Sequence, residues 1–392
     1  MLNNIIAGAD PALTWPARCW PVVIPVAFVI SCVATLLCEK IAPRLGVVDK
    51  PDNLVKTHNR PIPYLGGVAI FIGLIGGMLA SLPWLPEWYS GPEAFKWTLG
   101  LLAAGAIACA VGTLDDVFDI RPWQKITGQI IAAIVLVAVG ITPNLYSLSW
   151  PAKLVVDTVF VVVFVLGATN SLNLLDGLDG LCAGVTAVMT AAMIALAALM
   201  ATKCSYPGCA EVGAEIIILC LALLASVLGF LIFNYHPARI FMGDAGSLLL
   251  GLNMAVLMIM FSKGGLQFWL ASIVIFGLPI LDTAVAFARR IINKKPLFVS
   301  DRGHIYDQMM DRGMTVRKTV NLCYAFAALY AVAGLVVSQM PIPWATAVCL
   351  AIVIISALIV WRKGYLKMTG LRGAHPSGNP GSADHTLDDR IR

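Results

Sequence analysis

Acidic and amide side chains gather in three short segments of an otherwise apolar chain, GTLDDVFD, ATNSLNLLDGLDG and FMGDAGS. The candidates in these segments are Asp115, Asp116, Asn170, Asn173, Asp176, Asp179 and Asp244. Carboxylate and amide oxygens are ligands of hard cations such as Mg²⁺. Charged groups are costly beside apolar helices, at about 2.5–3.5 kcal/mol near a bilayer centre. The three segments are therefore expected to bind a ligand.

Each segment also has a plainer interpretation. The pair Asp115 and Asp116 could be a solvated helix end, or one of the two could have a raised pKa and act as a base. Asp119 would share the face of Asp115 if that helix continued. Asp244 could simply cap the helix that follows it.

Basic side chains that could contact a phosphate lie in the same or nearby loops. Lys56 and Lys125 are the candidates for phosphate contacts, and Arg302 and His304 stand together in VSDRGHIYDQ. The need for positive charge on one side of a membrane could also account for such residues.

Asp282 lies within the apolar segment GLPILDTAVAFARR and is an additional candidate, because an acid inside a membrane helix is usually functional. Carboxylates and amides that place Mg²⁺, with cationic groups that neutralise phosphate oxygens, describe phosphoryl transfer. The chain has no P-loop and no glycine-rich dinucleotide motif, so ATP or dinucleotide binding is not indicated.

The elements that must position these residues are apolar helices. Of the 392 residues, 59% are hydrophobic and 12% are charged, whereas a soluble domain carries about 25% charged residues. Stretches of spanning length, roughly 17 to 25 residues, occur eleven times. They are 20–41, 64–82, 97–114, 126–142, 153–169, 179–201, 214–234, 244–261, 266–288, 320–338 and 343–361. The sequence therefore predicts an all-α integral membrane protein with about 11 transmembrane helices.

The distribution of Lys and Arg predicts the orientation. With eleven spans, 22 of the 27 basic residues fall on one side, which places the N-terminus outside and the C-terminus in the cytoplasm. The net charge of +5 needs no nucleic acid to explain it. The first apolar stretch lacks signal-peptide features and is expected to be a retained helix. We expect an outer segment 1–19, a polytopic domain 20–361 and a disordered cytoplasmic tail 362–392.

Two of the ten cysteines, Cys204 and Cys209, stand in the predicted outer loop KCSYPGCAE. They could form a disulfide in an oxidising compartment or remain two thiols. The other eight lie in or beside apolar helices and are expected to be small core residues.

These motifs, in this order, resemble those of the polyprenyl-phosphate N-acetylhexosamine-1-phosphate transferase family, of the glycosyltransferase family 4 type. The block NSLNLLDGLDGL with the later FMGDAGS is the most specific match, and the DD pair and GLPILD support it. The resemblance implies Mg²⁺-dependent transfer of a sugar-1-phosphate from a UDP-sugar to polyprenyl (undecaprenyl) phosphate, with release of UMP. Mn²⁺ could replace Mg²⁺. The expected place is the cytoplasmic face of the inner (plasma) membrane, and a homodimer stays open.

The resemblance also implies roles for single residues. Asp244 matches the Mg²⁺ ligand, with Asn173 as a polar partner, and His304 matches the first histidine of an inner loop. Asp115 and Asp116 match an acidic pair that activates the lipid phosphate or shapes the metal site. The expected nucleotide-sugar contacts are Asn170, Asp176, Asp179, which matches a residue at the uracil end, Asn234 and Arg302.

The chain departs from the family after His304, where Tyr306 and Asp307 replace further histidines. It also lacks the triple-His segment of the muramyl-pentapeptide transferases. A simple UDP-N-acetylhexosamine is therefore favoured, with N-acetylglucosamine-1-phosphate as the expected group. The alternatives are a muramyl-pentapeptide phosphotransferase and, in another class, a proton- or ion-coupled secondary transporter.

Overall fold

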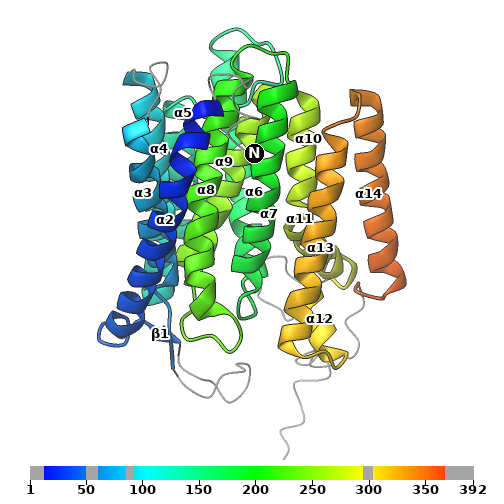
Figure 1. The fold of residues 1–392 in the computed structure, drawn as a ribbon. Helices are drawn as coiled ribbons and strands as arrows, with labels where there is room; N and C mark the ends of the chain where they lie inside the picture. Colours follow the sequence, from blue (N-terminus) through cyan, green and yellow to red (C-terminus); the bar gives the residue numbers. More distant parts are fainter. Residues whose placement is uncertain (1–12, 50–60, 85–91, 295–302, 367–392) are drawn as a thin grey trace, which may run out of the picture.

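The computed structural model describes residues 13–49, 61–84, 92–294 and 303–366. In these residues the chain forms a bundle of long helices that run side by side (Figure 1). They are α2 (Thr14–Ile41), α3 (Gly66–Ser81), α4 (Pro92–Phe118), α5 (Pro122–Ala138), α6 (Ala152–Leu175), α7 (Leu181–Lys203), α8 (Cys209–Asn234), α9 (Gly243–Phe261), α10 (Leu266–Ile275), α11 (Gly277–Ile292), α12 (Ile305–Asp311), α13 (Val316–Val337) and α14 (Ile342–Arg362).

The protein is an all-α membrane protein, as predicted. Among the described residues, nine helices are long and apolar enough to cross a membrane. Helices α10 and α11 together are also long and apolar enough, but they are bent by 66° relative to each other. Helix α5 is apolar but shorter. All eleven predicted stretches are thus helical, while the number of crossings stays a prediction. The only sheet in this part of the chain is an antiparallel pair of β1 (Val48–Asp49) and β2 (Ile62–Pro63).

Several predicted boundaries are wrong. Helix α2 begins at Thr14 and not at residue 20, so the expected outer segment 1–19 is helical from Thr14 onward. Helix α6 continues to Leu175, so Asn170 and Asn173 lie on its last turns and not in a loop. Most of the expected tail, from residue 367, lies outside the described residues.

Helix α9 is the centre of the bundle and positions the site. The most apolar part of α9 is completely buried, whereas only 11% of the most apolar part of α14 is buried. Helix α9 packs against α3, α4 and α6. The contact with α4 is close, because a Cβ added at Gly112 would lie 2.3 Å from the backbone nitrogen of Ala245. This approach brings the end of α4 onto the start of α9.

The break between α10 and α11 lies at Phe276. Pro279 has no N–H to donate to the carbonyl of Ile275, which favours a bend at this point. The break turns α11 toward α6, which it contacts. We use "polar end" for the end of the bundle where α4, α6 and α8 finish and α9 begins, which is the lower end in Figure 1.

Candidate active site

Two acids at the end of α4 meet the start of α9. Asp116 accepts the backbone N–H groups of Asp244 at 2.9 Å and of Ala245 at 3.3 Å. Helix α9 has no side-chain cap from its own N-cap residue, so Asp116 caps it from a neighbouring helix. The left-handed Gly243, at φ +66°, keeps this contact free of a Cβ that would lie 2.3 Å from Asp116 Oδ2.

Lys125 joins three of the predicted residues in one cluster. Its Nζ lies 3.0 Å from Asp115 Oδ2, donates to Asn173 Oδ1 at 3.2 Å and bonds Asp244 Oδ2. Asn173 Nδ2 in turn donates to Asp244 Oδ1 at 2.6 Å and to Ser247 Oγ at 3.0 Å. The carboxylate of Asp244 therefore faces side chains of α5 and α6. Both of its carboxylate oxygens are bonded to these side chains.

We call Asp115, Lys125, Asn173 and Asp244 the "lysine cluster". It is largely shielded from solvent, with 15% of the Lys125 and Asp115 side chains and 28% of the Asp244 side chain exposed. Charges interact more strongly in such surroundings than in water. Two carboxylates of the cluster face one ammonium, and Asp116 adds a third carboxylate beside them. A further cation could offset the negative charge that remains in the cluster.

Asn170 bonds to α5, whereas Asn173 bonds to both α5 and α9. Its Nδ2 donates to Gln129 Oε1 at 3.0 Å and to the Leu166 carbonyl at 2.8 Å. Gln129 is buried, and it follows Lys125 by one turn of α5. The sequence reasoning missed Gln129, although an amide four residues after Lys125 in an apolar segment is a usable signal.

Asp179 and Asn234 tie two loops of the polar end together. Asp179 Oδ2 accepts the backbone N–H of Ala238 at 3.0 Å and lies 2.7 Å from His236 Nδ1. Asn234 accepts the Gly180 N–H at 3.1 Å and donates to the Ile240 carbonyl at 2.9 Å. Both amide atoms of Asn234 are thus engaged within the protein. Sequence reasoning missed His236, which no spacing marks.

Asp176 follows the end of α6, between these loops and the lysine cluster. Burial raises its pKa well above the usual value, and the charges of Asp244 and Asp116 raise it further. The protonated form is therefore favoured while the cluster holds its own charges. A bound cation or a cationic ligand group would lower this pKa.

Asp282 and His304 lie together, outside the lysine cluster. The ring Nδ1 of His304 lies 2.7 Å from Asp282 Oδ2, and both side chains are buried. Lys56 and Arg302 lie outside the described residues. Asp119 is exposed at φ +48°, just after α4 ends, so it does not continue the helical face of Asp115.

An apolar groove of about 340 Å³ lies between α10, α11, α13 and α14. Its lining includes Leu281, Ala284 and Val285, which flank Asp282 in the sequence, and Leu366 beyond the end of α14. The groove therefore runs past the helix that carries Asp282. An aliphatic chain fits such a lining.

A bundle of apolar helices with acids, amides and a lysine gathered at its polar end defines a polytopic membrane protein with a charged site at that end. Residues 98–262 match the family model described as glycosyl transferase family 4. The chain belongs to this family, which confirms the resemblance seen in the motifs.

Three relatives support the assignment. The probable undecaprenyl-phosphate N-acetylglucosaminyl 1-phosphate transferase of Bacillus subtilis (strain 168) is 34% identical over 365 residues, covering 89% of this chain and 92% of its own. A decaprenyl-phosphate N-acetylglucosaminephosphotransferase of Mycobacterium tuberculosis (strain ATCC 25618 / H37Rv) is 29% identical over 358 residues, covering 83% and 85%. The undecaprenyl-phosphate alpha-N-acetylglucosaminyl 1-phosphate transferase of Escherichia coli O157:H7 is 29% identical over 321 residues, covering 78% and 81%.

Proposed function

We propose that this protein transfers N-acetylglucosamine-1-phosphate from UDP-N-acetylglucosamine to polyprenyl phosphate and releases UMP. This would be the first membrane step of a cell-envelope glycan. The names of the three relatives support the transferred group and the lipid phosphate. The lysine cluster carries the proposal, because it combines acids and an amide with a cation at the end of an apolar bundle.

The residues of the cluster fit a magnesium ion. Asp115 Oδ2, Asp244 Oδ2 and Asn173 Oδ1 are hard oxygen ligands that face one cation, the ammonium of Lys125. Among the described residues, no group of three or more His, Cys, Asp or Glu side chains is arranged to hold a metal ion. Asp115, Asp244 and Asn173 would hold Mg²⁺, or Mn²⁺ in its place, once Lys125 turns to a substrate phosphate. The metal would offset negative charge on the pyrophosphate.

The protein groups then have separate tasks in the transfer. A phosphate oxygen of the lipid forms a bond to the β-phosphorus of the UDP-sugar, and the bond from that phosphorus to the bridging oxygen breaks. The bridging oxygen leaves with its electron pair on UMP. Lys125 would neutralise phosphate charge, while Asp115 and Asp244 would hold the metal. Asp116 positions Asp244 by holding the start of α9.

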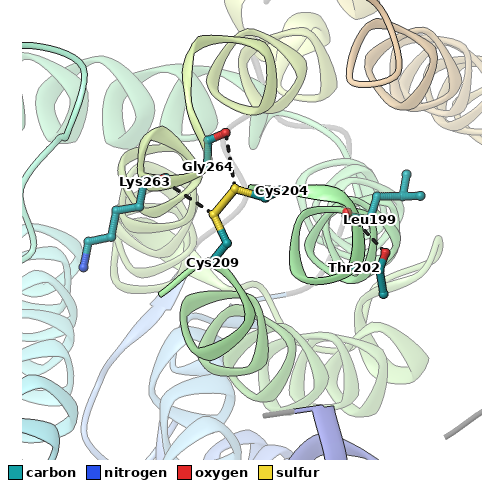
Figure 2. Close-up of a disulfide and its surroundings, with 6 residues drawn as sticks. All are labelled: Leu199, Thr202, Cys204, Cys209, Lys263 and Gly264. Atoms are coloured by element: carbon teal, nitrogen blue, oxygen red, sulfur yellow. Dashed lines mark hydrogen bonds between the residues drawn. A yellow bond between two sulfur atoms is a disulfide. The ribbon is translucent and has the colours of Figure 1, made fainter. Parts of the chain in front are cut away.

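The site would face the cytoplasm, in the inner membrane. Cys204 and Cys209 form a disulfide with a Cα–Cα distance of 6.1 Å, so the two-thiol alternative is not the one observed. Figure 2 shows this disulfide beside Lys263 and Gly264, whose carbonyl oxygens lie 3.9 Å from the two sulfurs. The disulfide joins the end of α7 to the start of α8, at the opposite end of these helices from Asp179 and Asn234. Because disulfides persist in oxidising compartments, the polar end would be the cytoplasmic one.

The position of the acids argues against a secondary transporter. Transporters place ionisable groups near the midplane, on discontinuous helices. Here Asp115 and Asp116 lie in the last turn of α4, and Asp244 lies in the first turn of α9. The broken pair α10 and α11 does contain Asp282, but that acid is bonded to His304.

A substrate panel tests the proposal. Purified protein would be incubated with undecaprenyl phosphate, Mg²⁺ and each of several UDP-sugars labelled in the sugar. We expect labelled lipid from UDP-N-acetylglucosamine. Label transfer only from UDP-muramyl-pentapeptide, or from none of the sugars, would reject the proposed substrate.

A further inference from the structure

The carboxylate of Asp282 makes two bonds to one short segment of the chain. Its Oδ2 lies 2.7 Å from His304 Nδ1, and its Oδ1 accepts the backbone N–H of Ile305 at 2.7 Å. Asp282 is 1% exposed and His304 is 5% exposed. One buried carboxylate therefore fixes both the ring and the adjacent backbone.

A second contact fixes the plane of the histidine ring. The rings of His304 and Tyr306 are stacked, with centroids 5.4 Å apart and planes at 7°. Tyr306 is held in turn, because its hydroxyl donates to the Leu174 carbonyl at 3.0 Å. Gly177 leaves room for that hydroxyl, since a Cβ there would lie 2.1 Å from it. The ring of His304 is thus tied to the loop that carries Asp176.

We propose that Asp282 is a positioning residue, which holds His304 with its Nδ1–H toward the carboxylate and so directs Nε2 to a phosphate of the bound UDP-sugar. This inference rests on the proposed function. With Nδ1–H engaged by Asp282, Nε2 is the ring nitrogen left for substrate. The family resemblance singled out His304, but no motif assigns a task to Asp282.

The charge around the ring agrees with a hydrogen-bond donor at Nε2. Burial lowers the pKa of His304, but the hydrogen bond and the charge of Asp282 outweigh burial and raise the pKa above the usual value. Asp307 also raises it, while Arg289 lowers it. An imidazolium donates from Nε2 to the phosphate oxygen that gains charge as UMP leaves. That bond offsets the electron pair left on UMP when the bridging bond breaks.

The structure predicts what an asparagine at position 282 would do. The N–H of Ile305 needs an acceptor, so the amide oxygen of the asparagine would take the place of Oδ1. The amide NH₂ would then face Nδ1, which must accept. The ring would become the neutral tautomer with its proton on Nε2, without the positive charge. The Nε2–H group would still be a donor, so the expected loss comes from the missing positive charge of the imidazolium.

Asp307 offers a matched control. Its Oδ2 accepts the backbone N–H of His304 at 3.3 Å, whereas the carboxylate bonded to the ring is that of Asp282. Asp307→Asn therefore removes one negative charge close to His304 while it leaves Nδ1 engaged by Asp282. An asparagine also serves well at such a capping position.

The experiment measures kcat and KM for Asp282→Asn, His304→Gln, Asp307→Asn and the double variant of Asp282→Asn with His304→Gln. We expect kcat to fall by about 100-fold or more in the first two, the scale of a lost electrostatic contact to charge that develops in the transition state. KM for the UDP-sugar should change by less than about threefold, because the interaction is made mainly in the transition state. Asp307→Asn should keep near-native kcat. The double variant should be no slower than His304→Gln alone, because Asp282 acts through the histidine.

Two results would overturn the inference while the proposed function stands. One is near-native kcat for Asp282→Asn, and the other is a further loss in the double variant equal to that of Asp282→Asn alone. No sugar-phosphate transfer by the wild-type protein would instead reject the proposed function. Should Asp282→Asn fail to fold, ¹⁵N-histidine NMR of the wild type decides, with His304→Gln assigning the signal. A protonated Nδ1 is expected, and an unprotonated Nδ1 would overturn the inference.

Discussion

Gly112→Ala should disable the site through backbone alone. The new Cβ would lie 2.3 Å from Ala245 N and 2.4 Å from the carbonyl carbon of Asp244, where ordinary contacts begin at 3.4 Å. Helices α4 and α9 must therefore separate by about 1 Å at this point. The bond between Asp116 Oδ1 and the Asp244 N–H, now 2.9 Å, would stretch beyond hydrogen-bond range.

The cost follows from these contacts. Overpacking lowers the stability of the fold by about 1–3 kcal/mol. Loss of the hydrogen bond to the charged cap, Asp116, lowers it by about 1.5–3 kcal/mol. A displacement of about 1 Å can lower a catalytic rate by about 100-fold. We expect a loss of that size in kcat, measured as UMP release, and a thermal unfolding midpoint lower by several degrees.

Gly105→Ala is the matched control for this prediction. It lies two turns earlier on α4, where an added Cβ would meet only side-chain atoms, Phe71 Cε2 at 3.0 Å and Leu249 Cδ1 at 3.4 Å. Both variants gain the same helix propensity, about 1 kcal/mol. The control should therefore keep near-native kcat and unfolding midpoint. Near-native values for Gly112→Ala as well would refute the reasoning.

Three further predictions concern the metal, the orientation and the lipid. Asp244→Asn should leave the protein folded but lower kcat by about 100-fold or more at limiting Mg²⁺; near-native turnover there would remove Asp244 from the metal site. A membrane-impermeant thiol reagent added outside intact cells should label Cys204 and Cys209 only after reduction, because they form a disulfide; labelling of this pair only from the cytoplasmic side would reverse the topology. Ala284→Trp, which fills the apolar groove, should raise KM for a long polyprenyl phosphate, whereas Ala347→Trp on the exposed face of α14 should not; equal KM values would exclude the groove as the site of the lipid tail.

Apolar stretches and local motifs made much of this protein predictable. Each predicted span contains helix, because a run of about 20 apolar residues in lipid has to satisfy its own backbone groups. The acids and amides were expected near helix ends, and Asn234 does end α8 while Asp244 lies in the first turn of α9. The positions of those residues at helix ends can be predicted from the local sequence alone.

The pairing of side chains from distant segments was not predictable. Lys125 and Asp244 are 119 positions apart, and no pattern in either segment indicates that they bond. The role of Asp116 as a cap for α9 depends on the close packing of Gly112 against Ala245. The bend before α11 was also missed, because Pro279 stands in a run that is long and apolar enough to be taken as a single span.

The fate of the β-phosphate tests the central claim most directly. Wild-type protein would be incubated with undecaprenyl phosphate and UDP-N-acetylglucosamine carrying ³²P in the β-phosphate. The account predicts that the label moves to the lipid with the sugar, and that unlabelled UMP is released in equal amount. Release of labelled UDP, with the sugar alone on the lipid, would mean glycosyl transfer and would contradict the account.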